Sequence, residues 1–123
     1  MIKILLVGLG GFFGAIARYA VSRASLYMFG SKFPYGTLLV NISGSFFLGC
    51  ILGTYFLKNM NGDYLKLLVG TGFLGAFTTF SAFSIETIYL FEEGRHIAGA
   101  ANVFGNLFLS LSAALLGMML VRQ

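Results

Sequence analysis

The sequence predicts an all-α integral membrane protein with four transmembrane helices. Its 123 residues are 58% hydrophobic and only 10% charged, whereas soluble domains are about 45–50% apolar and about 25% charged. The mean hydropathy is +0.88. Four apolar stretches are each at least as long as the roughly 20 residues that cross a bilayer as a helix. These predicted spans are residues 4–27, 34–57, 64–91 and 96–121, so we expect one membrane domain over residues 1–123.

The connections between the predicted spans are short and polar. They contain the sequences SKFPYG, with the only proline of the chain, then KNMNGDY at residues 58–64, and EEGRH. Proline, glycine, asparagine and aspartate are the residues that favour tight turns. We therefore expect three turns at the membrane surface and no soluble domain.

Positive charges are distributed almost evenly between the two sides of the predicted bundle. The side of the termini holds Lys3, Lys58, Lys66 and Arg122, and the opposite side holds Arg23, Lys32 and Arg95, with Arg18 inside the first span. The positive-inside bias that normally fixes orientation is therefore nearly absent. Insertion in both orientations, and an antiparallel dual-topology homodimer, follow as expectations. The net charge of +4 lies mostly at span ends, where it suits phospholipid headgroups rather than nucleic acid.

The third predicted span contains the segment GTGFLGAFTTFSAF at residues 70–83. Its glycines weaken a helix and its hydroxyl groups compete for backbone hydrogen bonds, so we expect the third helix to be broken mid-membrane. Freed backbone groups are tolerated in a bilayer only where protein buries them or where they line a cavity. Carbonyl groups around Gly75 and Thr78 suit a small cation, and the amides of the following half-helix favour an anion. The break thus predicts an ion-handling site, and an antiparallel dimer would bring two breaks together around a buried cation.

Small residues recur at close spacing in the first three spans. Examples are Gly10 with Gly14, and Ser45, Gly49 and Gly53. Such residues let helix backbones approach closely in lipid. The pattern favours packing within one subunit and packing between subunits about equally.

Polar residues form a stripe along the fourth span. Asn102, Asn106 and Ser110 repeat every four residues, and Asn41 and Ser45 lie one turn apart in the second span. A stripe of this kind is either a set of hydrogen bonds between helices or the wall of an ion path. Two such faces in contact would favour the path.

Aromatic and charged side chains complete the candidate site. Phe80 and Phe83 share one face of the third span, and their positive ring edges, beside Asn and Ser donors, would replace the water around a small anion without trapping it. Arg18 would either attract anions or extend to the interface. Glu86 would either pair with a donor or reach water.

Three segments resemble the signature segments of the Fluc (CrcB) fluoride channels. They are GGFFGAIARY, GTLLVNISGSFFLG and GFLGAFTTFSAF, in the family's order and in a chain of the family's length. The resemblance implies a dual-topology homodimer in the bacterial inner membrane, with two antiparallel fluoride pores and a sodium ion buried at the dimer centre.

The resemblance also implies roles for individual residues. Asn41 matches the pore asparagine, Phe80 and Phe83 match the phenylalanines that face fluoride, and Gly75 and Thr78 match the positions whose carbonyls hold sodium. Ser81 and Ser110 match polar residues along the fluoride route, Arg18 matches the arginine of the first motif, and Glu86 matches the acid that follows the third. We assign all four to the fluoride route, to which the stripe adds Asn106. Ala82 departs from the family, which usually has a hydroxyl residue there.

The predicted function is passive, selective fluoride export that lowers cytoplasmic fluoride, without enzymatic activity. The alternative is a small multidrug-type cation/proton antiporter, which shares the size and the span count. That class needs a deep carboxylate, and the first span has Arg18 instead. A structural subunit without transport activity is the third possibility, although it would not need the polar stripe or the broken helix.

Overall fold

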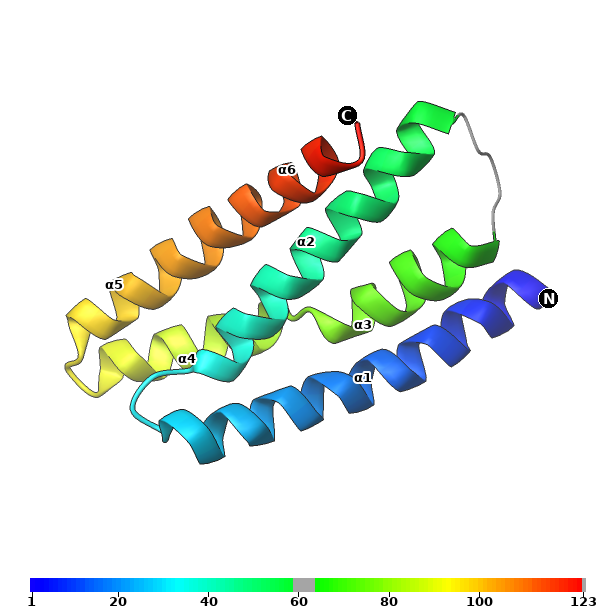
Figure 1. The fold of residues 1–123 in the computed structure, drawn as a ribbon. Coiled ribbons are helices and arrows are strands. Elements are labelled where there is room, and N and C mark those ends of the chain that lie inside the picture. The colour runs from blue at the N-terminus through cyan, green and yellow to red at the C-terminus, as the bar shows by residue number, and fades with distance from the viewer. Residues whose placement is uncertain (59–63, 123) are drawn as a thin grey trace.

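The computed structural model describes residues 1–58 and 64–122, and every regular element in this part is helical (Figure 1). The elements are α1 (Ile2–Phe29), α2 (Tyr35–Lys58), η1 (Lys66–Leu74), α3 (Gly75–Phe77), α4 (Phe80–Glu92), α5 (His96–Phe104), η2 (Gly105–Leu109) and α6 (Ser110–Leu120). Two of them, η1 and η2, are π-helical. The turn predicted at residues 58–64 falls mostly outside the described residues.

Four helical stretches are long and apolar enough to cross a membrane. They are Ile2–Phe29, Tyr35–Thr54, Lys66–Glu92 and His96–Leu120. The prediction of four transmembrane helices is therefore confirmed by length and composition. Both termini lie at the same end of the bundle (Figure 1), as four crossings require.

The helices pair along their lengths. α2 packs along α6, α1 packs along η1 and α3, and α4 packs against α5. In Figure 1, α2 lies between the α5–α6 pair on one side and the other helices on the other side. This arrangement places the start of α4 beside α2, where the candidate site is formed.

Glycines bring α1 into backbone contact with η1. A Cβ atom added at Gly10 would lie 2.0 Å from the Leu68 carbonyl oxygen, and one added at Gly14 would lie 2.1 Å from the Phe73 carbonyl oxygen. A Cβ at Gly8 would meet nothing within 4 Å. Gly10 and Gly14 thus serve packing within one chain, one of the two alternatives that the sequence left open.

Glycines also permit the close approach of α2 and α6. A Cβ at Gly49 would lie 2.2 Å from the Ala114 carbonyl oxygen, and one at Gly117 would lie 2.2 Å from the Phe46 carbonyl oxygen. The contact is reciprocal, because each helix contributes a glycine opposite the backbone of the other. Small residues thus take the place that large interdigitating side chains have in a soluble core.

The interior of the described chain is polar rather than apolar. The buried apolar side chains are Val40, Leu74, Leu90 and Ala113, whereas the buried polar ones are Ser25, Thr37, Thr79, Thr87, Asn102 and Asn106. Large apolar side chains instead cover the outside of every long helix. This distribution suits a bilayer, because lipid solvates the outside and the buried polar groups bond to one another.

The helix that contains the 70–83 segment is interrupted at Thr78 and Thr79. Thr78 has φ −75° and ψ 157°, and Thr79 has φ −151° and ψ 120°, so both are extended. The hydroxyl groups act locally there: Thr78 Oγ1 donates to the Leu74 carbonyl at 3.1 Å, and Thr79 Oγ1 accepts the Ala82 N–H at 3.2 Å as the cap of α4. Competition from hydroxyl side chains is thus visible at the interruption.

The glycines of this segment lie in the helical residues that precede the interruption, and two of them belong to the π-helical stretch. Gly70 and Gly72 lie within η1, and Gly75 begins α3. A Cβ at Gly72 would lie 2.8 Å from the Val7 carbonyl oxygen of α1. The helix tolerates Gly72 because this close packing stabilises it, whereas the loss of helical geometry occurs at the two threonines.

Candidate functional site

A groove of about 380 Å³ lies beside the interruption. It is formed by α2, the interruption, the start of α4, and the η2–α6 region. Its polar and aromatic lining residues are Asn41, Ser45, Thr78, Thr79, Phe80, Phe83, Asn106 and Ser110. We call it the interruption groove. Five of the residues predicted for the fluoride route therefore line one groove: Asn41, Phe80, Phe83, Asn106 and Ser110.

Asn41 connects α2 to the interruption. Its Oδ1 accepts the Thr79 N–H at 2.8 Å, and its Nδ2 donates to the Thr79 carbonyl at 3.1 Å. In a continuous helix the Thr79 N–H would bond to the carbonyl of Gly75. The Asn41 amide therefore replaces the missing helical partner and satisfies the backbone of the extended residue.

The polar stripe of the fourth span faces Asn41. Asn41 Nδ2 donates to Asn106 Oδ1 at 2.8 Å, and Asn106 Nδ2 donates to Asn102 Oδ1 at 2.9 Å. Asn102 is fully buried and Asn106 is 6% exposed. The two polar faces predicted on the second and fourth spans thus meet through hydrogen bonds between the helices, one of the two alternatives, and Asn41 and Asn106 also line the interruption groove.

Ser110 presents a donor without a partner. Its Oγ is buried, and it makes no hydrogen bond to any residue of the described chain. An unpartnered buried hydroxyl is costly. A ligand in the interruption groove would satisfy it.

Phe80 and Phe83 form an aromatic pair at the edge of the groove. Their ring centroids lie 5.4 Å apart with an interplanar angle of 56°. Phe80 is 79% exposed in the single chain, so most of its ring is not packed against other residues of the subunit. Ser81 is exposed and its Oγ lies 3.3 Å from Thr79 Oγ1.

Ala82 lies in the first turn of α4. Its N–H is bound by Thr79 Oγ1 at 3.2 Å, so the backbone bond that caps the helix does not need a hydroxyl at position 82. The methyl side chain contributes no donor of its own. An alanine at this position therefore supplies no polar side chain and leaves the cap intact.

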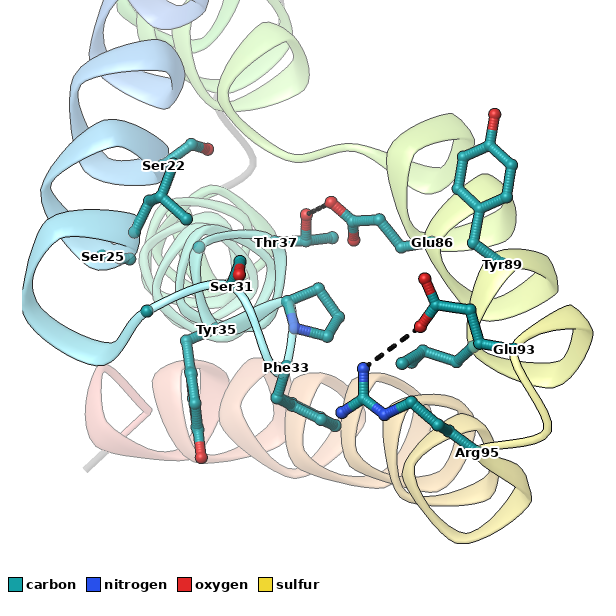
Figure 2. A pocket seen from close by; sticks show the side chains of 15 residues that line it. Ser22, Ser25, Ser31, Phe33, Tyr35, Thr37, Glu86, Tyr89, Glu93 and Arg95 are labelled. Atoms are coloured by element: carbon teal, nitrogen blue, oxygen red, sulfur yellow. Dashed lines mark hydrogen bonds and ion pairs between the residues drawn. The ribbon is translucent and has the colours of Figure 1, made fainter.

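Glu86 lies outside the interruption groove. It lines a second cavity of about 320 Å³, formed by the end of α1, the start of α2 and the last turns of α4 (Figure 2). Thr37 Oγ1 donates to Glu86 Oε1 at 2.7 Å. The other carboxylate oxygen, Oε2, is buried and makes no hydrogen bond to the described residues. Glu86 thus pairs with a donor, one of the two outcomes that the sequence allowed.

Two further charged residues, Glu93 and Arg95, line this second cavity. Arg95 Nη1 lies 3.4 Å from Glu93 Oε2, and Arg95 Nη2 donates to the carbonyl of Lys32. Figure 2 shows the ion pair between Arg95 and Glu93 as a dashed line. These bonds tie the loop between α1 and α2 to the turn between α4 and α5.

Arg18, Gly75 and Thr78 complete the predicted set. Arg18 is half-buried on α1, lines neither cavity and makes no hydrogen bond to another described residue. Gly75 is exposed at the start of α3, and Thr78 lines the interruption groove. In the described chain no group of three or more His, Cys, Asp or Glu side chains is placed to hold a metal, so a cation would depend on backbone oxygens.

Sequence reasoning missed three residues that organise the two sites. Thr79 makes the interruption with Thr78, Thr37 binds Glu86, and Thr87 accepts a hydrogen bond from Asn102 of the stripe. Asn102 belonged to the predicted stripe, for which hydrogen bonds between helices and an ion path were both open. Thr37 and Thr87 are single hydroxyl residues in apolar spans, and only their polarity at membrane depth could have singled them out.

Comparison with known proteins assigns the family. Residues 5–118 match the family described as "CrcB-like protein, Camphor Resistance (CrcB)". The chain belongs to the CrcB family. The three signature segments of this CrcB chain lie in α1, in α2 and across the interruption, where they supply the glycine contacts, Asn41 and the phenylalanine pair.

Relatives of this CrcB chain match it over nearly its whole length. The protein of Shewanella amazonensis is 43% identical over 121 residues, covering 98% of this chain and 97% of the relative. One from Shewanella sp. strain W3-18-1 is 47% identical with the same coverage. One from Dehalococcoides mccartyi is 42% identical over 115 residues, covering 94% of this chain and 88% of the relative. Each carries the name "Fluoride-specific ion channel FluC".

Proposed function

We propose that this CrcB chain forms a fluoride-selective channel that conducts fluoride passively out of a bacterial cell through the inner membrane. The observation that carries the proposal is the composition of the interruption groove. Its polar lining consists of neutral amide and hydroxyl groups beside two phenyl rings, and no charged side chain lines it. Relatives at 42–48% identity that are named fluoride channels support the choice of ion.

The groove chemistry suits a small, strongly hydrated anion. Leaving water costs such an ion its hydration energy, which O–H and N–H donors and positive ring edges would replace. Ser110 supplies an uncommitted hydroxyl donor, and Phe80 and Phe83 supply ring edges. Without a full positive charge in the groove, binding stays weak enough for the ion to leave.

The single chain leaves this site open, which supports a second copy in inverted orientation. Phe80 is 79% exposed, and an aromatic ring that contacts an ion must be shielded from lipid. An inverted copy would place its own surface over the groove, and the symmetry would create two antiparallel pores. The nearly even distribution of positive charge allows both orientations.

The same arrangement would place two interruptions at the bilayer midplane, with a sodium ion between them. Backbone oxygens of this chain could act as ligands for such an ion. The Thr79 N–H bonds to Asn41 and not to the Gly75 carbonyl, which leaves that oxygen outside the helical pattern. Carbonyl oxygens of Gly75 and Thr78 are the hard ligands that such a cation prefers. One chain supplies two of them, so the second copy would supply the rest.

Flux from liposomes tests the channel proposal. Purified protein in potassium fluoride-loaded liposomes should release fluoride when valinomycin short-circuits the potential, and chloride-loaded liposomes should release almost none. Equal release of both anions would contradict selectivity. Uptake of a labelled lipophilic cation driven by a proton gradient would instead identify an antiporter.

Labelling from one side tests the inverted dimer. Ser31→Cys in a Cys50→Ser background places a single thiol in the loop between α1 and α2. An impermeant maleimide should label about half of the protein in sealed vesicles if both orientations occur. Complete labelling, or none, would indicate one orientation.

Dialysis against sodium-free buffer tests the cation. Subunit exchange between two differently labelled samples should become faster when sodium is replaced by N-methylglucamine. An exchange rate independent of sodium would contradict a structural sodium ion.

A further inference from the structure

Five hydrogen bonds run in one direction through the polar interior of the bundle. The Thr79 N–H donates to Asn41, Asn41 donates to Asn106 and Asn106 donates to Asn102, with donor–acceptor distances of 2.8, 2.8 and 2.9 Å. Asn102 Nδ2 then donates to Thr87 Oγ1 at 2.9 Å, and the Thr87 hydroxyl donates to the carbonyl of Phe83 at 2.7 Å. We call this series the hydrogen-bond chain.

Backbone groups fix the direction of the hydrogen-bond chain at both ends. A backbone N–H only donates, so Asn41 must turn Oδ1 toward Thr79. A backbone carbonyl only accepts, so Thr87 must give its single proton to Phe83 and keep a lone pair for Asn102. Each amide between these ends has one orientation that satisfies both neighbours. The assigned amide orientations are therefore the ones that chemistry requires.

Burial makes this orientation costly to change. Asn102 is 0% exposed, Asn106 is 6% exposed and Thr87 is 8% exposed, so water is not available to replace a lost partner. Hydrogen bonds in such series polarise one another. A change at Thr87 should therefore reach Asn41, although no hydrogen bond joins the two directly.

We propose that Thr87 is a positioning residue that, through Asn102, holds the Asn106 and Asn41 amides in the orientation that the interruption groove needs. Thr87 does not line that groove, so it would act only through the other residues. The proposal rests on the proposed fluoride conduction for its functional readout. The hydrogen-bond chain begins at Thr79 in the interruption and ends at the carbonyl of Phe83 in α4. It thus links both ends of the short segment that carries Phe80 and Phe83 to the polar stripe of the fourth span.

Three variants test this role. Thr87→Val keeps the shape of the side chain but removes its hydroxyl group, and it leaves Asn102 Nδ2 without its acceptor. Thr87→Ser keeps the hydroxyl. Thr54→Val is the matched control, because Thr54 Oγ1 makes the same bond to the carbonyl four residues earlier, on Cys50, at 2.9 Å, and it donates to no other residue of the described chain.

Two measurements are made on each variant in lipid bilayers. Solid-state NMR follows the side-chain ¹⁵N resonances of Asn41 and Asn106, assigned with Asn41→Asp and Asn106→Asp samples. Liposome efflux gives the fluoride rate and its ratio to the chloride rate. We expect Thr87→Val to move both resonances and to lower the fluoride rate by about tenfold, since a buried amide loses its acceptor. Thr87→Ser should restore both, and Thr54→Val should change neither.

Unmoved Asn41 and Asn106 resonances in Thr87→Val would overturn the proposal, and so would moved resonances with an unchanged fluoride rate. If Thr87→Val does not fold, Thr87→Ala, which also lacks the hydroxyl but adds no bulk, is judged by the same two criteria. Absence of fluoride flux from the wild-type protein would defeat the proposed function alone, and the resonances would still decide whether Thr87 orients the amides.

Discussion

Asn41 binds both backbone polar groups of Thr79, its Oδ1 accepting the N–H at 2.8 Å and its Nδ2 donating to the carbonyl at 3.1 Å. Backbone groups released inside a bilayer have no water to bond to, so an interruption needs a partner within the protein. One asparagine on α2 supplies that partner for Thr79. The interruption and the second span therefore depend on each other.

Replacing Asn41 should disrupt the interruption and stop conduction. Asn41→Leu leaves the Thr79 N–H unpaired, at a cost of about 1–3 kcal/mol, and removes one of the donors to the Thr79 carbonyl, which as the N-cap carbonyl of α4 also accepts a bond within that helix. Asn41→Asp keeps an acceptor for the N–H but loses both donors, so its stability should lie between those of Asn41→Leu and the wild type. Thermal unfolding in detergent and fluoride efflux measure the two effects. Ser43→Ala is the control, since Ser43 Oγ bonds only within its own helix, to Leu39; an Asn41→Leu protein as stable as Ser43→Ala would contradict this account.

Replacing the ring of Phe80 should affect flux far more than stability. Because Phe80 is 79% exposed in the single chain, Phe80→Ile removes little packing within the subunit, and the free energy of unfolding should change by less than about 1 kcal/mol. Fluoride efflux should fall by at least about tenfold if the ring edge contacts the ion, since that loss corresponds to about 1.4 kcal/mol. Phe104→Ile, at a ring that is 57% exposed and does not line the groove, is the control. Equal efflux from the two variants would remove Phe80 from the site.

Thr37 and Glu86 should be energetically coupled. Thr37→Val removes the hydrogen bond that Glu86 Oε1 receives, and a hydrogen bond of this kind contributes about 0.5–1.5 kcal/mol. In a double-mutant cycle with Glu86→Leu, which removes the acceptor oxygen, the two changes should therefore be less than additive in the free energy of unfolding. Glu92→Leu, at an exposed carboxylate on the same helix, should show additive behaviour with Thr37→Val. Additivity in both cycles would mean that the Thr37–Glu86 bond contributes nothing.

The glycine contact between α1 and η1 should tolerate no side chain. A Cβ at Gly14 would lie 2.1 Å from the Phe73 carbonyl oxygen, while one at Gly8 would meet nothing within 4 Å. Gly14→Ala should therefore separate the helices and destabilise the fold by about 1–3 kcal/mol or more. Gly8→Ala should be neutral or slightly stabilising, since alanine favours helix. Unfolding in a detergent series compares the two, and equal midpoints would contradict the packing described here.

The number and position of the membrane helices followed from the sequence alone. Apolar length decides whether a segment crosses a bilayer, and this property is local to each segment. The stripe of Asn102, Asn106 and Ser110 was also readable, because helical periodicity puts residues four apart on one face. Membership of the CrcB family could be inferred for a similar reason, since each of its three signature segments is a continuous stretch of sequence.

What the sequence could not provide were the partners of these faces. The glycines and hydroxyl residues of 70–83 indicated a helix break but not its place, since contact with α1 keeps Gly72 in a helix and the break falls at Thr78 and Thr79. Glu86 was grouped with the fluoride route, and the sequence could not show that Thr37 binds it or that it lines a second cavity. A glycine or a carboxylate has several acceptable environments, and only the neighbours brought by folding select among them. The sequence by itself determined which segments enter the membrane and which faces are polar; the tertiary structure decided which of those faces meet, because hydrogen bonds and backbone contacts between helices depend on distances that no single segment contains.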